Sequence, residues 1–192
     1  MIHGVLIFNK KCQPRLRKFY TPVELPKQKL LLEQVYSYIS QRNTELQCSF
    51  MVAPSSVLSD SRGSVTDDDN IQIIYKNYAT LYFAFIVDEQ ESELVILDLI
   101  QTFVEALDRC FTEVSELDLI FNWQTLESVL EEIIQGGMVI ETSVAKIVNC
   151  VDDLNNASEE SESGAGMFGG TAIGNAFQAL TNGKFSQWAS SQ

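Results

Sequence analysis

The chain has 192 residues, a net charge of −13, 45% hydrophobic residues and 20% charged residues. These values are those of a single ordinary globular domain. No run approaches the roughly 20 consecutive apolar residues that cross a bilayer, and the apolar N-terminal segment lacks the basic region of a signal peptide. We therefore expect a cytoplasmic protein. The acidity argues against nucleic acid as a partner, because that binding needs clustered Lys and Arg.

The charge is distributed unevenly along the chain. Residues 1–76 contain ten of the thirteen Lys and Arg residues and seven acids, whereas residues 77–192 contain three basic residues and nineteen acids. This asymmetry predicts a surface with one basic end and one acidic end. A local basic site near the N-terminus is compatible with it.

The N-terminal part reads as a hairpin followed by a helix. Residues 2–9 and 15–20 are β-rich and flank a polar turn, which predicts an antiparallel pair. Both faces of the first strand are apolar, a pattern typical of a strand that is covered on two sides. Pro26, followed by apolar residues at helical spacing, predicts a helix over 25–41. Residues 47–53 are compatible with a short strand.

A polar segment separates this part from two further strands. Residues 54–70 are rich in Ser and Asp and are expected to form an exposed insertion loop. The Asp residues at its end lack the ligand spacing and the glycine of a calcium loop. Residues 71–76 and 78–87 then form two β-rich runs with a very tight connection. The second run is apolar on both faces, which places it in the middle of the sheet.

The segment 91–112 predicts a long helix with an unusually wide apolar stripe. A helix of this kind must be covered on more than one side, and we expect another chain to supply part of the cover. The stripe comprises Leu94, Leu97, Ile100, Phe103, Val104, Leu107 and Phe111, widened by Val95, Ile96 and Leu99.

The C-terminal part begins with helical segments and ends in a segment of different composition. Residues 116–135 have helical periodicity, and Gly136-Gly137 is expected to stop the helix. A last helix is predicted over 143–154. Residues 155–192 are rich in Gly, Ala and Ser, so we expect a disordered tail after a domain that spans 1–154.

The residues that usually indicate enzymes or metal sites are missing or misplaced. No phosphate-binding loop, nucleophile elbow or zinc-protease motif occurs. One GxGxxG pattern at 164–169 has no strand before it, so nothing would direct its amides at a pyrophosphate. His3 is the only histidine, and the four cysteines are far apart and unpaired in any CxxC motif, which argues against a zinc site. We therefore predict a protein without catalytic residues, metal or cofactor.

Pairs of neighbouring acids occur on the predicted helices, where they could in principle act as acid–base groups. Such pairs usually form a solvated helix face, and this is the interpretation we adopt. The pairs are Glu91 with Glu93, Glu116 with Asp118, and Glu131 with Glu132.

The order of elements predicts an antiparallel sheet with helices packed on its faces, an α/β fold of the α+β type. Several sequence blocks also resemble the sigma, or small, subunits of the heterotetrameric adaptor protein complexes. These blocks are 1–9, 14–20, 73–83, 103–105, 114–122 and 136–142. Residues 91–94 and 97–101 resemble the sigma subunit of the third, vacuolar or lysosomal, complex of yeasts in particular.

The resemblance implies a longin-like fold with a five-stranded antiparallel sheet and helices on both faces. It implies a heterotetramer in which this chain packs into a large delta-type subunit, beside beta and mu subunits. It further implies vesicle transport from the Golgi or endosome to the vacuole or lysosome, with the complex peripheral on those membranes. Sigma and the large subunit together would bind acidic dileucine signals, [DE]xxxL[LI], in cargo tails.

The resemblance also transfers a set of candidate cargo-binding residues. Arg15 matches the basic residue near the acidic position of the signal, and an Arg is suited to a carboxylate. The apolar positions around the two leucine pockets match Ala79, Leu81, Val104, Val114, Leu117 and Leu119. Burying one leucine contributes about 1.5–3 kcal/mol before ordering costs.

Three different interpretations remain open at this point. Val104, Leu117 and Leu119 could belong to the core, with Arg15 a solvated hairpin residue. The chain could instead be a longin-type regulatory module of a membrane-fusion or tethering protein, which should continue into a coiled-coil segment or an anchor. An enzyme would require a pocket lined by His3, a cysteine or clustered acids.

Overall fold

The computed structural model describes residues 1–42, 49–53, 71–111 and 114–165. It contains a five-stranded sheet of strand order β2-β1-β5-β4-β3, in which all neighbours are antiparallel. This confirms the predicted sheet. The strands are β1 (Ile2–Asn9), β2 (Pro14–Phe19), β3 (Phe50–Ala53), β4 (Ile71–Tyr78) and β5 (Leu81–Asp88).

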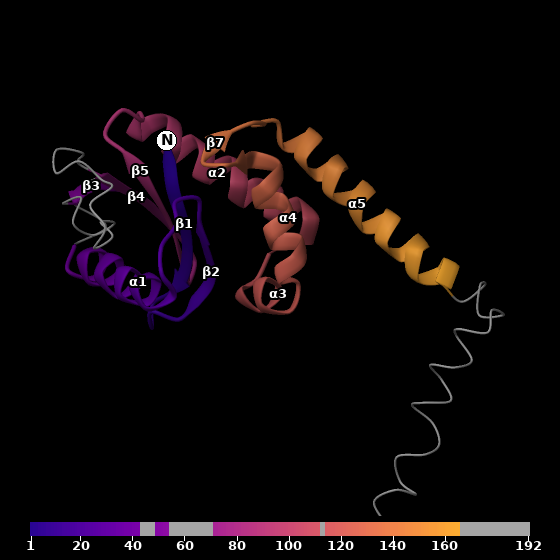
Figure 1. Ribbon diagram of the computed structural model, residues 1–192, viewed down its shortest axis with the longest axis horizontal. Coiled ribbons are helices and arrows are strands. Elements are labelled where there is room, and N and C mark those ends of the chain that lie inside the picture. Colours follow the sequence, from indigo (N-terminus) through magenta and orange to yellow (C-terminus); the bar gives the residue numbers. More distant parts are fainter. Residues whose placement is uncertain (43–48, 54–70, 112–113, 166–192) are drawn as a thin grey trace, which may run out of the picture. The chain divides into compact units, whose positions relative to one another are not determined.

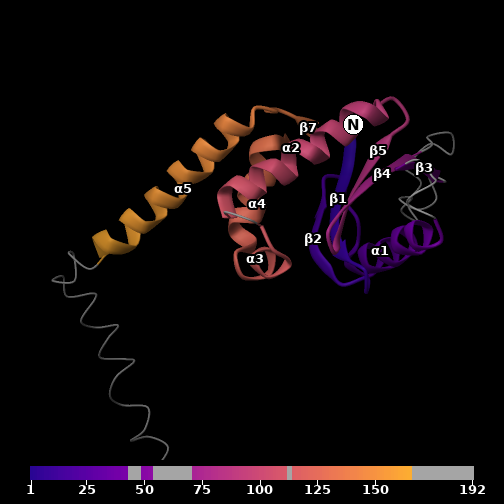
Figure 2. The same cartoon turned by 180° about the vertical axis from the view of Figure 1, so that it is seen from behind.

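Helices cover both faces of this sheet. One face carries α1, and the other carries α2 and α4, as Figure 1 and the reverse view in Figure 2 show. The helices are α1 (Leu25–Ser40), α2 (Glu93–Phe111), α3 (Glu116–Phe121), α4 (Trp123–Ile133) and α5 (Val144–Ala165).

The central strands contribute side chains to two separate cores. Along β1, Val5 and Ile7 pack with α2 and α4, whereas Leu6 and Phe8 pack with α1. Because successive side chains of a strand point to opposite faces, an all-apolar strand needs cover on both sides. β5 alternates in the same way and lies beside β1 in the middle of the sheet. The predicted two-sided burial of both strands is confirmed.

The middle of the apolar stripe of α2 is covered by this chain itself. Its residues Ile96, Leu99, Ile100, Phe103 and Leu107 are at most 3% exposed and belong to the core shared with β1, β5 and α4. The chain therefore covers the middle of the stripe, and the expectation that another chain covers the rest stays a prediction. The width of the stripe reflects contact with both the sheet and α4.

The first turn of α2 lies outside the buried part of the stripe, although its residues are apolar. Leu94 and Val95 are 77% and 59% exposed. They precede the part of α2 that packs into the core, so apolar character at these two positions does not mark a core contact.

Gly136 and Gly137 form a turn rather than a simple helix stop. α4 is followed by β6 (Ile134–Gln135) and β7 (Met138–Val139), which pair across these two glycines. Their φ angles of 58° and 80° lie in the left-handed region, which glycine adopts at no steric cost. The carbonyl of Gly137 accepts a hydrogen bond from the Ile2 amide at 2.9 Å, so the turn also contacts the start of β1.

The last helix is longer than predicted. α5 runs from Val144 to Ala165, whereas the sequence predicted an end at 154. Its residues Ile147 and Val151 are buried in the core of the first compact unit, Met1–Val151; Asp152–Gln192 forms a second unit. The predicted 54–70 insertion loop, and the predicted tail beyond 165, lie outside the described residues.

The Gly136-Gly137 turn provides a matched pair of substitutions that tests how closely it packs on β1. A Cβ at Gly137 would lie 2.4 Å from the Ile2 carbonyl oxygen, whereas a Cβ at Gly136 would meet nothing within 4 Å. We expect Gly136→Ala to cost about 1 kcal/mol for its left-handed backbone alone. Gly137→Ala should cost clearly more, because a backbone atom must also move. Urea unfolding measures both, and equal losses would contradict the close packing.

Candidate functional site

The connection between β1 and β2 is organised by Asn9. Its side-chain oxygen accepts from the backbone amides of Lys11 (2.9 Å) and Gln13 (3.0 Å). Asn commonly folds a following turn in this way, because its side chain replaces a backbone acceptor. Cys12, which takes a φ of 60°, donates its amide to the Asn9 carbonyl at 3.0 Å. The turn therefore holds the start of β2 in a defined position.

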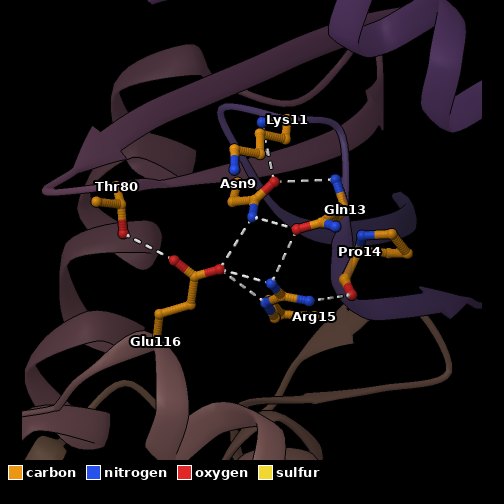
Figure 3. A network of polar contacts seen from close by, with 7 residues as sticks. All are labelled: Asn9, Lys11, Gln13, Pro14, Arg15, Thr80 and Glu116. Carbon is orange, nitrogen blue, oxygen red and sulfur yellow. Dashed lines mark hydrogen bonds and ion pairs between the residues drawn. The ribbon is translucent and has the colours of Figure 1, made fainter.

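The amide group of the same Asn9 faces a carboxylate from a distant helix. Asn9 is only 8% exposed, and its Nδ2 donates to Gln13 Oε1 at 2.9 Å and to Glu116 Oε1 at 3.0 Å. Both ends of this buried side chain thus have partners, as buried polar groups require. Figure 3 shows how Asn9 connects the turn to Glu116.

Arg15 forms an ion pair with this carboxylate. Its Nη2 and Nε donate to Glu116 Oε1 at 2.6 and 3.0 Å, and the two side chains are 16% and 26% exposed. The pair joins β2 to α3 across 101 residues of sequence. Arg15 is therefore a partly buried, paired cation, and the interpretation of Arg15 as a solvated hairpin residue is wrong.

The start of α3 fixes the position of Glu116. Ser115 is the N-cap and accepts from the amide of Asp118, whose carboxylate accepts from the amide of Ser115. This reciprocal arrangement satisfies two amides that a helix start leaves without partners. Glu116 is consequently the first residue of the helix. The interpretation as a solvated pair is wrong for Glu116, which binds Arg15, whereas Asp118 caps the helix through an exposed hydrogen bond.

The tight turn between β4 and β5 completes the surroundings of Glu116. Tyr78 pairs with Leu81, so the turn consists of Ala79 and Thr80 alone. Thr80 Oγ1 donates to Glu116 Oε2 at 3.1 Å. Ala79 has a φ of 52°, a left-handed conformation that is uncommon for alanine. We call Asn9, Gln13, Arg15, Thr80 and Glu116 the Glu116 network; Figure 3 shows these five side chains.

The donors around Glu116 change its acidity. The hydrogen bond from Arg15 is the largest cause that lowers the pKa of Glu116 from its ordinary value of 4.5, with smaller contributions from Asn9 and Thr80. Donors that bind a carboxylate favour its charged form. Glu116 is therefore ionised at neutral pH. The donors of the Glu116 network bind a single carboxylate, and in this structure that carboxylate is the side chain of Glu116.

The candidate residues taken from the resemblance differ in burial, and only Arg15 belongs to this network. Arg15 belongs to the network, and Ala79 is exposed in the neighbouring turn. Val104 and Val114 are half-buried and pack against the core that α2 and α4 form with the sheet. Leu117 is 62% exposed, whereas Leu81 and Leu119 are 7% and 0% exposed and belong to that core.

The elements that carry these residues are linked by side-chain contacts. Thr80 connects the β4–β5 turn to α3, and Tyr78 OH donates to Gln101 Oε1 of α2 at 2.5 Å. Val104 lies one turn beyond Gln101 on the same side of α2. The interpretation as a core residue is correct for Leu119 and wrong for Leu117.

A second group of charges lies next to the network on β2. Lys18 Nζ binds Glu127 Oε1 at 2.6 Å and Glu131 Oε1 at 2.7 Å, both from α4. An open groove of about 320 Å³ lies between these elements. Its lining comprises Pro14, Arg15, Leu16, Arg17, Lys18, Trp123 and Glu127.

Sequence reasoning missed Glu116 as the partner of Arg15, and Asn9 and Thr80 as further partners of Glu116. Glu116 lies inside a block that carries the family resemblance, but its neighbour Asp118 made a solvated pair the simpler interpretation. Pattern and periodicity act over a few residues, whereas this contact spans 101. The acidity of the second half of the chain was the one signal in the sequence that pointed to ion pairs with the basic hairpin.

The described residues contain neither a metal-binding cluster nor a membrane span. Among them, no three His, Cys, Asp or Glu side chains are arranged to hold a metal ion. No helix in the same part of the chain combines the length and apolarity needed to cross a membrane.

The Arg15–Glu116 pair should contribute measurably to stability. In a double-mutant cycle of Arg15→Ala and Glu116→Ala, we expect a coupling energy of about 1 kcal/mol, since the pair is only partly exposed. The pKa of Glu116 is lowered in the fold. The coupling should therefore be complete above the ordinary carboxyl range and be lost as the pH falls through the lowered value. Urea unfolding at several pH values measures it; additive single effects at neutral pH would contradict the pair.

The chain resembles known proteins over most of its length. Residues 1–158 match the family model described as clathrin adaptor complex small chain. AP-3 complex subunit sigma of Saccharomyces cerevisiae is 69% identical over 194 residues, and that of Eremothecium gossypii is 72% identical over 192, each covering 100% of both chains. Human AP-3 complex subunit sigma-2 is 40% identical over 164 residues, which cover 85% of this chain and 79% of the human one.

A structural comparison agrees with these matches. The chain matches one subunit in a homology model of the full-length AP-3 complex in a stretched open conformation. The identity is 75%, the TM-score is 0.63, and the match covers 85% of this chain and 98% of the other. These similarities argue against both a longin-type regulatory module and an enzyme. The chain belongs to the clathrin adaptor complex small-chain family, as a non-enzymatic sigma subunit of the AP-3 type that acts in vesicle transport.

Proposed function

We propose that this sigma subunit packs directly against a large delta-type subunit, in a heterotetramer that also contains beta and mu subunits. Through that complex it associates peripherally with Golgi or endosomal membranes and serves transport to the vacuole or lysosome. The support is the near-complete similarity to AP-3 sigma subunits, together with an apolar surface that the described part of the chain leaves uncovered.

The proposed contact with the large subunit is the outer face of α3 and the start of α4. Within four residues, Ile120, Phe121 and Trp123 are 42%, 78% and 56% exposed. Clustered apolar surface of this kind indicates a protein–protein contact. Aromatic residues are also the side chains that most often contribute strongly to interface stability.

We further propose that the chain, together with the large subunit, binds acidic dileucine signals. The observation that carries this is that Arg15 and Thr80, the neighbour of Ala79, both bind Glu116 at the start of α3, while Val104 and Val114 pack against the core that contains Leu81 and Leu119. Arg15 would contact the acidic residue of the signal. Val104, Val114 and Leu117 offer partly exposed apolar surface for the leucines, above Leu81 and Leu119.

A single exposed side chain tests the proposed subunit contact. Phe121→Asp should abolish co-purification with the delta-type subunit, because it places a charge in an apolar interface. It should barely change the unfolding midpoint of the isolated chain, since Phe121 is 78% exposed. Leu25→Asp is the matched control, because Leu25 is 74% exposed on α1, at the opposite face of the sheet. Normal assembly of the Phe121 variant would place the interface elsewhere.

Cargo recognition is tested with two peptides that differ only at the acidic position, four residues before the leucine pair. In the assembled complex, Arg15→Ala should lower the affinity for the acidic peptide by about fivefold, equivalent to about 1 kcal/mol. The peptide with Ala at that position should be unaffected, because it has no carboxylate to lose. Arg17→Ala, two residues along β2, is the control for general loss of positive charge. Titration at low salt measures the affinities; equal weakening of both peptides would remove Arg15 from the site.

A further inference from the structure

The carboxylate receptor that the cargo proposal requires is already filled by Glu116. Its Oε1 accepts from Arg15 Nε, Arg15 Nη2 and Asn9 Nδ2, and its Oε2 accepts from Thr80 Oγ1. A carboxylate offers about four lone-pair positions. Both oxygens of the carboxylate therefore have donors from this chain, which Figure 3 shows as Asn9, Arg15 and Thr80 around Glu116.

We propose that Glu116 is a specificity-determining residue, an internal competitor that occupies Arg15 until the acidic residue of a cargo signal displaces it. This inference rests on the proposed function, since it concerns the same dileucine site. The partner chemistry is a carboxylate on an extended peptide, which matches Glu116 in charge and in hydrogen-bonding capacity.

The exchange has a simple energetic consequence. When an incoming carboxylate replaces Glu116 on Arg15, one charge-assisted contact is made while another is broken. The acidic residue of the signal then contributes only the difference between the two contacts, and the leucines supply most of the affinity. Glu116 therefore lowers the preference for signals with an acid over signals without one.

The geometry provides a route for this exchange. Arg15 Nη1 faces away from Glu116, toward the carbonyl of Pro14 at 3.3 Å. Because a guanidinium has five donor hydrogens in a fixed plane, Nη1 can hold an incoming oxygen before Glu116 leaves. Glu116 lies at the first residue of α3, a helix of six residues, and it is 26% exposed, so its side chain can turn into solvent.

A purely structural role for the pair predicts a different behaviour. If Glu116 only held Arg15 in place, loss of its charge would leave Arg15 less ordered and lower the affinity for the acidic peptide. If Glu116 competes, loss of its charge frees the Arg15 guanidinium and raises the affinity for the acidic peptide. The direction of the change separates the two roles.

The experiment uses the assembled complex and the same two peptides, with an acidic residue or Ala four positions before the leucine pair. Glu116→Gln keeps a side-chain oxygen for Arg15 but removes the charge. We expect it to bind the acidic peptide about fivefold more tightly, with the Ala peptide unchanged. In the double variant Arg15→Ala, Glu116→Gln, this gain should disappear.

Glu127→Gln is the matched control. It removes one carboxylate from the neighbouring ion pair with Lys18, and so changes the net charge by the same amount without touching Arg15. An equal gain in this control would overturn the inference, because the effect would then be general electrostatic attraction. Circular dichroism and co-purification of each variant establish that folding and assembly are intact.

The remaining outcomes distinguish failure of the competitor role of Glu116 from failure of the proposed dileucine site. If the wild-type complex binds neither peptide, the dileucine site itself is wrong, and the inference fails with it. If the complex binds the peptides but Glu116→Gln leaves the ratio of their affinities unchanged or lowers it, only the competitor role is overturned. If Glu116→Gln raises the ratio of the affinity for the acidic peptide to that for the Ala peptide, and the increase requires Arg15, the competitor role is supported.

Discussion

The two central strands, β1 and β5, are apolar on both faces, and the remaining architecture follows from that constraint. Neither face of these strands can meet water, so α1 must cover one side while α2 and α4 cover the other. Polar groups are then restricted to the ends of the strands and to the turns between elements. The Glu116 network lies at such a position, where β1 ends and the β4–β5 turn and α3 begin.

The uneven charge of the sequence has a different meaning once the chain is folded. Arg15 and Lys18, on the basic N-terminal hairpin, bind Glu116, Glu127 and Glu131 from the acidic helices of the second half. Part of the predicted basic end is therefore neutralised inside the chain. These ion pairs hold β2, an edge strand, to the helices, which gives the asymmetry a structural role.

The sequence was sufficient to predict those helices and strands that depend on residues close together in the chain. The alternation along β1 and β5, the apolar spacing in α1 and Pro26 at its start all act over a few residues. β1 and α1 were predicted to within one residue at each end, whereas β5 begins at Leu81 rather than at the predicted residue 78. The resemblance supplied the five-stranded arrangement. The short hairpin at Gly136-Gly137 was missed because two strands of two residues each leave no periodic signal.

The candidate site was less predictable because it depends on contacts between distant segments. Arg15 was identified through the resemblance alone, and its partner Glu116 was assigned to solvent. The depth of each apolar residue also depends on packing, since Leu117 and Leu119 are two positions apart on one helix yet differ from 62% to 0% exposed. No property of the residue type distinguishes two leucines.

The buried part of the α2 stripe has a consequence for the kinetics of complex formation. Because Ile100, Phe103 and Leu107 are buried by the chain's own sheet and α4, this core is complete without side chains from a partner, and we expect folding to precede assembly. Joining the complex is then an encounter between finished surfaces, with a rate that rises with the concentration of both proteins. A subunit that folded only on its partner would instead be limited by ordering the chain, and would spend that waiting time open to proteolysis.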